Sequence, residues 1–366
     1  DVFRKKESES PAYCLSIFTT LALTVWFAVQ ASSGETHYVF SNLAVFDPMA
    51  QVLSSFCSLA LLVTFVYTRR YLADREMYNG EFYILALFTL LGQVVMISGN
   101  NFLTLYLGLE LLSLASYALV ALRRRSNVSS ESGMKYFILG ALASGLLLYG
   151  MSMLYGATGS LDLGEVFRAI NTGNINKTIL VFGVVFVVAG LAFKLGAAPF
   201  HMWVPDVYQG SPTAVTLLIA GAPKVAAFAM TLRILVEGLL PLAFDWQNML
   251  IVLAVASLAI GNITGVVQTN FKRLLAYSTV SHMGFLLLGM LSGVSAGKPD
   301  LTAQAYSASM FYAITYVLTA LGAFGVILLL ARKGYEAEEI ADLKGLSKKS
   351  PWFALLMLFM MMSLAG

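Results

Sequence analysis

The chain has 366 residues, of which 58% are hydrophobic and only 12% charged, and its formal net charge is +3. Soluble domains carry about 25% charged residues, so this composition, with a mean hydropathy of +0.77, excludes an ordinary soluble enzyme or nucleic-acid-binding protein. Apolar runs of roughly 20 residues, enough to cross a bilayer, recur along the chain, and the alternating segments of a β-barrel are absent. The sequence predicts an all-α, polytopic membrane protein.

The apolar runs place ten membrane spans along the chain. They lie near residues 11–31, 45–67, 82–99, 101–122, 134–156, 178–207, 211–236, 247–267, 274–292 and 304–331. An eleventh begins near Ser350 and is cut at Gly366, and the first residue is Asp1. We therefore expect both ends to be truncated.

The basic residues of the loops predict the orientation. Alternate loops hold 17 Lys and Arg on one side, in the segments 4–6, 69–75, 123–135, 272–273 and 332–349. The opposite loops hold three, namely Arg168, Lys177 and Lys298. Positive charge accumulates on the cytoplasmic side of membrane proteins, so the first group should face the cytoplasm or matrix. The net charge is a topology signal.

The basic residues outside the loops are Lys194, Lys224 and Arg233, all within expected spans, and Glu110 is the acid in the middle of one, whereas Asp47 and Asp206 lie near span ends. At about 1.5 Å rise per residue, Glu110, Lys194 and Lys224 come out near the membrane midplane, in a row along the membrane plane. A charged group at this depth costs roughly 3 kcal/mol on insertion scales and indicates a functional site. The alternative is a structural ion pair, or a lysine that reaches the interface. Arg233 lies near a span end, where the structural reading is favoured.

A break is expected in the segment FKLGAAPFHMWVPDVYQGSP, residues 193–212. Pro199 removes a backbone donor and clashes with the carbonyl of Leu195, so a helix should break there. Lys194 would occupy the last turn of the first half-helix, whose free carbonyls favour a cation. His201 follows seven residues later, and 205–206 and 210–212 should form the turn into the next helix.

The next helix should be kinked as well, because Pro223 directly precedes Lys224. Irregular backbone at membrane depth is tolerated only inside protein or beside water. We therefore expect polar side chains and water to lie beside these two helix interruptions, inside the bundle.

Polar side chains also form faces on other spans. Tyr106, Glu110, Ser113 and Tyr117 share one helix face, which should point into the bundle. His282 lies beside Ser278 and Ser281; it is either a proton-transfer group or a hydrogen-bonded core residue. A face of tyrosines and threonines over 312–319 is equally well explained by packing.

Other chemistry is excluded. The two cysteines, Cys14 and Cys57, cannot hold an iron–sulfur cluster, which needs four ligands. The three histidines show no metal spacing, and no phosphate-binding or dinucleotide-binding glycine motif is present. We expect no cofactor or metal in this chain.

Three motifs resemble the antiporter-like subunits of respiratory complex I, the NADH:quinone oxidoreductase, which are related to Mrp antiporters. They are LGLELLSL (107–114), FKLGAAPFHMWVPDVYQGSP (193–212) and QTNFKRLLAYSTVSHMG (268–284). The ending PDVYQGSP resembles the N-type (chain 2) members more than the L and M types. The resemblance covers essentially the whole chain.

The resemblance implies two five-helix repeats of inverted topology, each with a broken helix. Residues 1–75 would hold two N-terminal helices, 82–236 the first repeat with its broken helix 178–207, and 245–366 a second repeat truncated in its fourth helix. One span would precede Asp1 and two would follow the cut one. Glu110, Lys194 and the bridging Lys224 would match the family's proton-translocating residues, while the lysine of the second broken helix would lie beyond Gly366.

The function implied is a non-redox, proton-translocating subunit of an NADH:quinone oxidoreductase, a translocase of the electron transport chain. Its partners would be the neighbouring membrane-arm subunits and the bilayer, with flavin and iron–sulfur clusters in other subunits. The expected location is the bacterial inner (plasma) membrane, rather than a mitochondrial or thylakoid membrane. The alternatives are an Mrp-type cation/proton antiporter subunit and a structural membrane scaffold.

Overall fold

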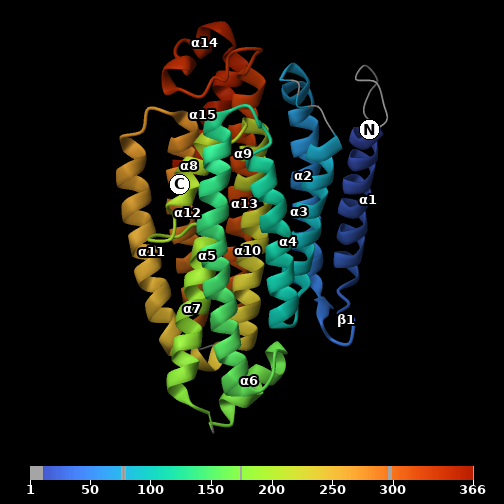
Figure 1. Cartoon of the computed structure of the whole chain (residues 1–366), viewed down its shortest axis with the longest axis vertical. Coiled ribbons are helices and arrows are strands. Elements are labelled where there is room, and N and C mark those ends of the chain that lie inside the picture. Colours follow the sequence, from blue (N-terminus) through green and yellow to red (C-terminus); the bar gives the residue numbers. More distant parts are fainter. Residues whose placement is uncertain (1–10, 76, 78–79, 174, 296–298, 366) are drawn as a thin grey trace.

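The computed structural model describes residues 11–365 except 76, 78–79, 174 and 296–298. Within that part of the chain, ten helical segments are long and apolar enough to cross a membrane. They run roughly side by side along the long axis of the molecule (Figure 1). This confirms the predicted polytopic helical bundle.

The spans follow the chain order. They are α1 (Pro11–Ser33), α2 (Pro48–Asp74), α3 (Gly80–Ser98), α4 (Phe102–Val120), α5 (Asn127–Thr158), α7 (Lys177–Leu195), a compound span made of α9 (Thr213–Ala220), α10 (Ala222–Leu232) and the π-helix η1 (Arg233–Gly238), then α11 (Ala243–Val266), α12 (Phe271–Ser295) and α13 (Pro299–Leu330). A shorter apolar helix, α15 (Pro351–Ala365), occupies the place of the expected eleventh span.

Polar caps set where several spans begin. The side chains of Asp47, Asn101, Ser126 and Asn176 each accept a hydrogen bond from a backbone N–H in the first turn of α2, α4, α5 and α7. Such caps satisfy donors that have no partner within the helix. The expected span 45–67 therefore starts later, at Pro48, because residues 44–46 form strand β2 (Ala44–Phe46), which pairs with β1 (His37–Val39).

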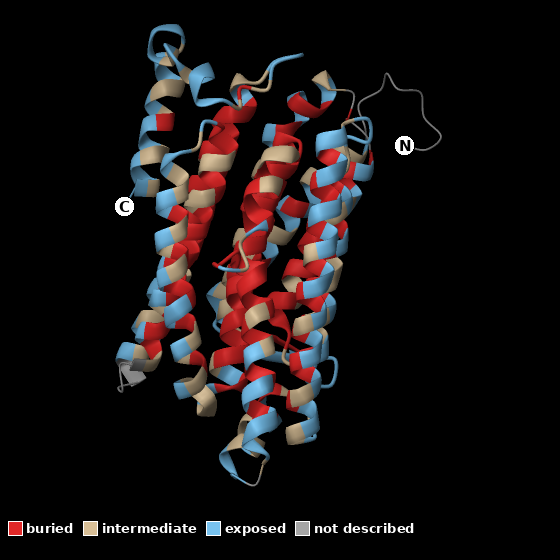
Figure 2. Cartoon of the chain, turned by 60° about the vertical axis from the view of Figure 1, so that its left-hand side comes forward, coloured by how far each residue is buried: buried red, intermediate tan, exposed pale blue. Residues whose placement is uncertain are grey.

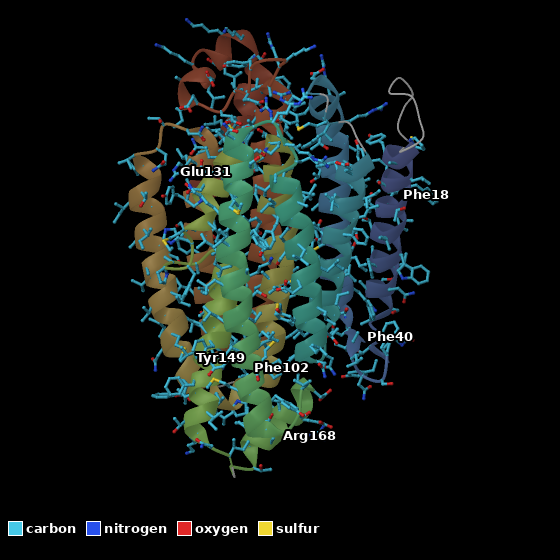
Figure 3. All side chains as sticks on the ribbon, viewed as in Figure 1. Phe18, Phe40, Phe102, Glu131, Tyr149 and Arg168 are labelled. Carbon is cyan, nitrogen blue, oxygen red and sulfur yellow. The ribbon has the colours of Figure 1, made fainter. Side chains whose placement is uncertain are left out.

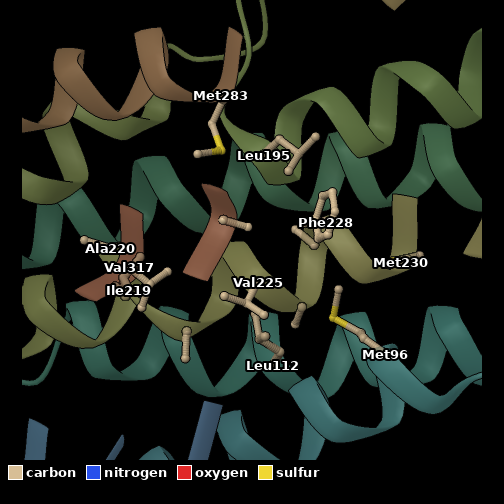
Figure 4. Packing of buried hydrophobic residues seen from close by; sticks show 14 of the residues in the cluster. Met96, Leu112, Leu195, Ile219, Ala220, Val225, Phe228, Met230, Met283 and Val317 are labelled. Carbon is tan, nitrogen blue, oxygen red and sulfur yellow. The ribbon is translucent and has the colours of Figure 1, made fainter. Parts of the chain in front are cut away.

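The compound span of α9, α10 and η1 forms the centre of the bundle. Its most apolar window is 100% buried, against 17% for α1 at the edge of the molecule. Figure 2 shows the buried residues concentrated in the inner helices and the exposed ones on the outer faces. Around α10, Val225, Phe228 and Met230 pack with Leu112 of α4 and Met283 of α12 (Figure 4).

Small residues allow close helix approach between α3 and α4. A Cβ added at Gly108 would lie 2.7 Å from the backbone nitrogen of Met96, and one at Gly92 would lie 2.6 Å from that of Leu112. Helices α5 and α7 approach in the same way, because a Cβ added at Gly150 would lie 2.7 Å from the carbonyl oxygen of Gly183. Such contacts are typical of membrane helices, where packing replaces the hydrophobic effect.

The basic loops gather at one end of the bundle. Arg75 after α2, Arg123 after α4 and Glu336 after α13 contact one another there. The short helix α14 (Leu346–Lys349) lies at this end, while the β-hairpin and α6 (Leu163–Asn171) lie at the opposite end (Figure 1). Figure 3 places Glu131 near the first end and Arg168 at the other. This is the sidedness that the charge count predicts.

Candidate functional site

The break after Lys194 is located by a glycine. Helix α7 ends at Leu195, and Gly196 follows with a φ of 82°, its N–H bonded to the carbonyls of Ala192 and Phe193. Glycine adopts this left-handed conformation without the steric cost of a Cβ. Pro199 lies three residues beyond, in the turn that leads to α8 (Trp203–Gly210). The break lies within the predicted segment 193–212, but the helix ends at Leu195 and not at Pro199, where the sequence places it.

The expected turn at residues 205–206 is wrong. Pro205 and Asp206 lie in the first turn of α8, and the chain reverses only at Ser211 and Pro212. A proline is compatible with a first helical turn because the N–H that it lacks would have no helical partner. Asp206 instead forms ion pairs with Lys135 at 3.0 Å and Arg273 at 2.7 Å.

Two side chains cap the free carbonyls at the end of α7. The indole Nε1 of Trp203 donates to the carbonyl of Phe193 at 2.9 Å, and Nζ of Lys224 donates to that of Leu195 at 2.8 Å. The ammonium of Lys224 also lies 4.8 Å from the centroid of the Trp203 ring. A cation at a helix C-terminus is stabilised by the helix dipole, so Lys224 and the broken end of α7 form one unit.

Lys224 belongs to a second interrupted helix. Helix α9 ends at Ala220, Gly221 has non-helical angles, and Pro223 lies in the first turn of α10. The predicted kink at Pro223 is therefore present. It places the side chain of Lys224, 3% exposed, in the interior beside the break in the preceding segment.

Lys194 and Glu110 each form a hydrogen bond with a serine hydroxyl. Nζ of Lys194 donates to Oγ of Ser113 on α4 at 2.7 Å, and the hydroxyl of Ser144 on α5 donates to the carboxylate of Glu110. The Ser144 oxygen also lies 3.1 Å from the Tyr106 hydroxyl. Among the described residues the two charged groups form no direct ion pair, and each binds a serine hydroxyl instead.

A small cavity borders this cluster. Its polar lining comes from Ser113, Tyr117, Ser144 and Lys194. The predicted polar face of α4 thus points into the bundle against α5 and α7, as expected from the cost of placing it against lipid. The hydroxyls that line the cavity can accept and donate hydrogen bonds. They can therefore exchange protons with the ammonium of Lys194 and the carboxylate of Glu110.

The two candidate histidines lie in different surroundings. Nδ1 of His201 is buried and lacks a hydrogen-bond partner in the described structure, and its ring centroid is 6.4 Å from that of Tyr277. Nδ1 of His282 lies 2.6 Å from the hydroxyl of Tyr312, with Tyr316 next to the ring. The hydrogen bonds described for the chain do not join either histidine to Lys194 or Lys224.

Arg233 is part of a structural contact at the opposite end of the bundle. Its guanidinium pairs with Asp47 at 2.8 Å and Glu237 at 2.6 Å, and Nε donates to the carbonyl of Ile97 at 3.2 Å. These bonds tie η1 to α2 and α3. The geometry favours the structural reading of this arginine.

Sequence reasoning missed several residues around the breaks. Ser144 and Ser257 are hydroxyls in apolar helices, where such residues are common; Ser257 accepts a hydrogen bond from the N–H of Ala198 at 2.8 Å. Trp203 lies inside the motif 193–212, but the sequence pattern assigns it no role. Lys272 was counted as a loop charge, yet its side chain is 0% exposed. The reversal of α8 into α9 explains this burial, because it covers the first turn of α12.

A polar network joins the loops at the basic end. Glu336 accepts hydrogen bonds from Nε of Arg75 at 3.0 Å, from the Tyr71 hydroxyl at 2.9 Å and from Arg123 at 3.3 Å. Burial alone would raise the pKa of Glu336, but the hydrogen bond and charge of Arg75, with the bond from Tyr71, outweigh it. The net result is a pKa below the ordinary value of this carboxyl.

Comparison with known families identifies the region that contains these groups. Residues 99–366 match the family described as NADH:quinone oxidoreductase/Mrp antiporter, transmembrane. A protein of Cupriavidus taiwanensis named NADH-quinone oxidoreductase subunit N is 71% identical over 366 residues, 100% of this chain and 74% of that protein. A protein of the same name from Herminiimonas arsenicoxydans is 60% identical over 370 residues, 100% of this chain and 75% of that protein.

Solved structures give the same result. A chain in respiratory complex I from Thermus thermophilus is similar with a TM-score of 0.76 and 33% identity, covering 97% of this chain and 76% of that one. A chain in the Mrp complex of a Dietzia species has a TM-score of 0.81 at 23% identity, covering 98% of this chain and 66% of that one. The second likeness concerns the fold alone.

Proposed function

Because this chain belongs to the NADH:quinone oxidoreductase/Mrp antiporter transmembrane family, we propose that it is the proton-translocating, N-type membrane-arm subunit of an NADH:quinone oxidoreductase. Redox energy released in other subunits drives protonation changes in this one. The chain acts as the non-redox part of a translocase, and flavin and iron–sulfur clusters belong to its partners.

The observation that carries the proposal is the pair of buried lysines at interrupted helices. Lys194 is 8% exposed and Lys224 3%, and each lies at an end of broken backbone. An ammonium at membrane depth is costly, so its presence there indicates a function. A lysine in such a site releases its proton more readily than in water, because burial disfavours its charged form.

The hydrogen bonds suggest how the row works. Lys194 exchanges a proton with Glu110 through Ser113, Ser144 and the adjoining cavity. Lys224 senses the same event because it donates to the carbonyls of Leu195 and, at 3.5 Å, Lys194 itself. A change of charge on one lysine therefore alters the electrostatic cost of the charge on the other.

We propose that another membrane subunit covers the face formed by α4 and α5. Glu110 is only half-buried in this chain, although it lies near the middle of its span. A carboxylate at that depth against lipid would be expensive, so a partner with polar or cationic groups fits better than acyl chains. The bacterial relatives support a location in the plasma membrane, with the basic loops in the cytoplasm.

The test is the variant Glu110→Gln, which keeps the size and hydrogen-bonding capacity of the side chain and removes its charge. The complex should be purified through a tag on this chain and placed in proteoliposomes. We expect flavin and iron–sulfur subunits to co-purify, NADH oxidation to continue, and proton uptake per NADH to fall. Glu131→Gln at the exposed basic end is the control.

Two results would reject the proposal. Purification without redox subunits would favour an Mrp-type antiporter. Loss of assembly in Glu110→Gln, with unchanged pumping in whatever complex remains, would favour a structural scaffold.

A further inference from the structure

A third lysine at an interrupted helix lies outside the midplane row. Lys272, in the first turn of α12, is 0% exposed although its helix begins at the basic end of the bundle. Its Nζ donates to the carbonyl of Ser211, where α8 ends, and to the carboxylate of Glu338, each at 2.8 Å. Like Lys224, it therefore binds a free carbonyl at the end of a half-helix.

In the ion pair between Lys272 and Glu338, only the carboxylate is exposed to solvent. The side chain of Glu338 is 23% exposed, whereas that of Lys272 is fully enclosed. Burying an ammonium costs several kcal/mol even when it is paired, and an arginine or an exposed pair would attach the loop 332–349 equally well. The arrangement thus places a group that can lose its proton behind a carboxylate that touches water.

Hydroxyl groups continue from this pair into the bundle. Oγ1 of Thr213 lies 3.4 Å from Glu338, and the hydroxyls of Ser211 and Thr216 are 2.8 Å apart in the next turn. Thr213 and Thr216 lie in the first turn of α9, and the same chain segment continues through Gly221 to Lys224. The polar contacts therefore point from the basic end toward the midplane lysines.

We propose that Glu338 and Lys272 take up protons from the cytoplasmic side and supply the midplane row. When the ammonium of Lys272 passes its proton to the hydroxyl groups of Ser211, Thr213 and Thr216, it becomes a neutral amine. The carboxylate of Glu338 takes a proton from water and transfers it along the 2.8 Å contact, which restores both charges. This inference rests on the proposed function of the chain.

The neighbouring charges fit other roles. Glu336 is held by two arginines, Arg75 and Arg123, and arginine is effectively never deprotonated in a protein. On the other side, Asp206 is held by Arg273 and by Lys135, whose side chain is 46% exposed. Among the lysines of this end that the structure describes, Lys272 is the fully buried one.

The decisive variant is Lys272→Arg in the whole complex, reconstituted in proteoliposomes. Arginine keeps the charge and the contacts to Glu338, so the complex should assemble, but the guanidinium does not release a proton. We expect NADH-driven membrane potential to fall several-fold. A wild-type potential and rate in Lys272→Arg would overturn the proposal.

A second variant distinguishes uptake from a structural clamp. Glu338→Gln should also lower the potential, and added formate, a small carboxylic acid, should restore part of it relative to wild type at the same formate concentration. Glu339→Gln is the control, because this exposed neighbour bonds Asn270 instead. A defect in Glu338→Gln that formate does not change would contradict uptake.

Failure of this inference is separable from failure of the proposed function. Impaired pumping in Glu110→Gln, with wild-type pumping in Lys272→Arg and Glu338→Gln, rejects only the uptake pair. Wild-type pumping in Glu110→Gln rejects the proposed function itself.

Discussion

At the scale of single residues, the contact between Lys224 and the end of α7 is the central feature. The ammonium is within 2.8 Å of the Leu195 carbonyl and faces the Trp203 ring. A Cβ at Gly196 would lie 3.3 Å from Nζ, so the glycine both ends the helix and leaves room for the ammonium. Gly196 therefore has two roles: it ends α7, and it leaves space for the ammonium of Lys224.

The substitution Lys224→Arg separates a proton-transfer role from a fixed charge. Arginine keeps a similar reach and a positive charge, but it cannot be deprotonated. We expect the complex to assemble and proton uptake per NADH to fall at least several-fold in proteoliposomes. A fixed-charge role predicts the opposite ranking, in which Arg is tolerated and Lys224→Met is damaging through loss of the carbonyl cap.

Rarity explains which site residues the sequence could identify. Glu110, Lys194 and Lys224 stood out because ionisable groups are scarce in apolar spans. Ser144 did not, because one hydroxyl in a membrane helix has many structural uses. Lys272 was misassigned to the surface, since its burial depends on how the turn at Ser211 packs against α12, which no local pattern reveals.

At the scale of helices, glycine contacts fix the distance between α3 and α4, and hence the position of Glu110. Gly108 stands two residues before Glu110 and packs against the backbone of Met96. Any side chain at Gly108 must push the two helices apart, because the nearest atom is the backbone nitrogen of Met96, which cannot rotate away.

We expect Gly108→Leu to destabilise the subunit by about 1–3 kcal/mol, the usual cost of overpacking, and to reduce the amount of assembled complex. The matched control is Gly145→Leu in α5, where an added Cβ meets nothing within 4 Å. The measurement is the yield of intact complex and its thermal inactivation. Equal behaviour of the two variants would show that the α3–α4 contact tolerates separation.

The sequence predicted approximately where the helices are interrupted, but not which residues end them. The proline pattern correctly located breaks within 193–212 and before Lys224, yet α7 ends at Leu195, before Gly196, and α9 ends at Ala220, before Gly221. A positive φ depends on how the chain must turn, which the packing of α8 decides. The β-hairpin at 37–46 was missed because its strands have three residues each.

At the scale of the whole molecule, the sequence predicted the number and sidedness of the spans but not their arrangement. Every span is apolar, so composition could not distinguish the fully buried α9–α10 segment from α1 at the periphery. The difference arises from the interruptions, since broken backbone is tolerated only inside protein. The broken helices must therefore occupy the centre.

The orientation of the bundle can be tested with single cysteines. We expect Arg125→Cys and Lys348→Cys, at the basic end, to react with an impermeant maleimide only after the cells are opened, because positive loops remain cytoplasmic. Glu35→Cys, before the hairpin at the other end, should react in intact cells. Both basic-end positions and Glu35 are exposed, so rapid labelling of 125 and 348 from outside would reverse the orientation.

The last prediction concerns Glu336, which joins the loops that follow α2, α4 and α13 into one cap. Its pKa is lowered from the ordinary value of 4.5, so the folded state holds the ionised carboxylate more firmly than the unfolded chain does. A group of this kind contributes stability that is fully present above its unfolded pKa and is lost as the pH falls through its folded pKa. The contribution of Glu336 should therefore be complete at neutral pH and be lost progressively as the pH falls below 4.5.

The loss should be local, because the bonds of Glu336 hold the segment 332–349 against Arg75 and Arg123. Lowering the pH of the purified complex below 4.5 should increase proteolytic cleavage in this segment, measured by mass spectrometry of the fragments. Glu336→Gln should raise cleavage already at neutral pH and weaken its pH dependence, since the glutamine has no charge to lose. Glu131→Gln, whose exposed partner is Lys135, should leave both the level and the pH dependence as in the wild type. An unchanged pH profile in Glu336→Gln would mean that other carboxyls hold the cap.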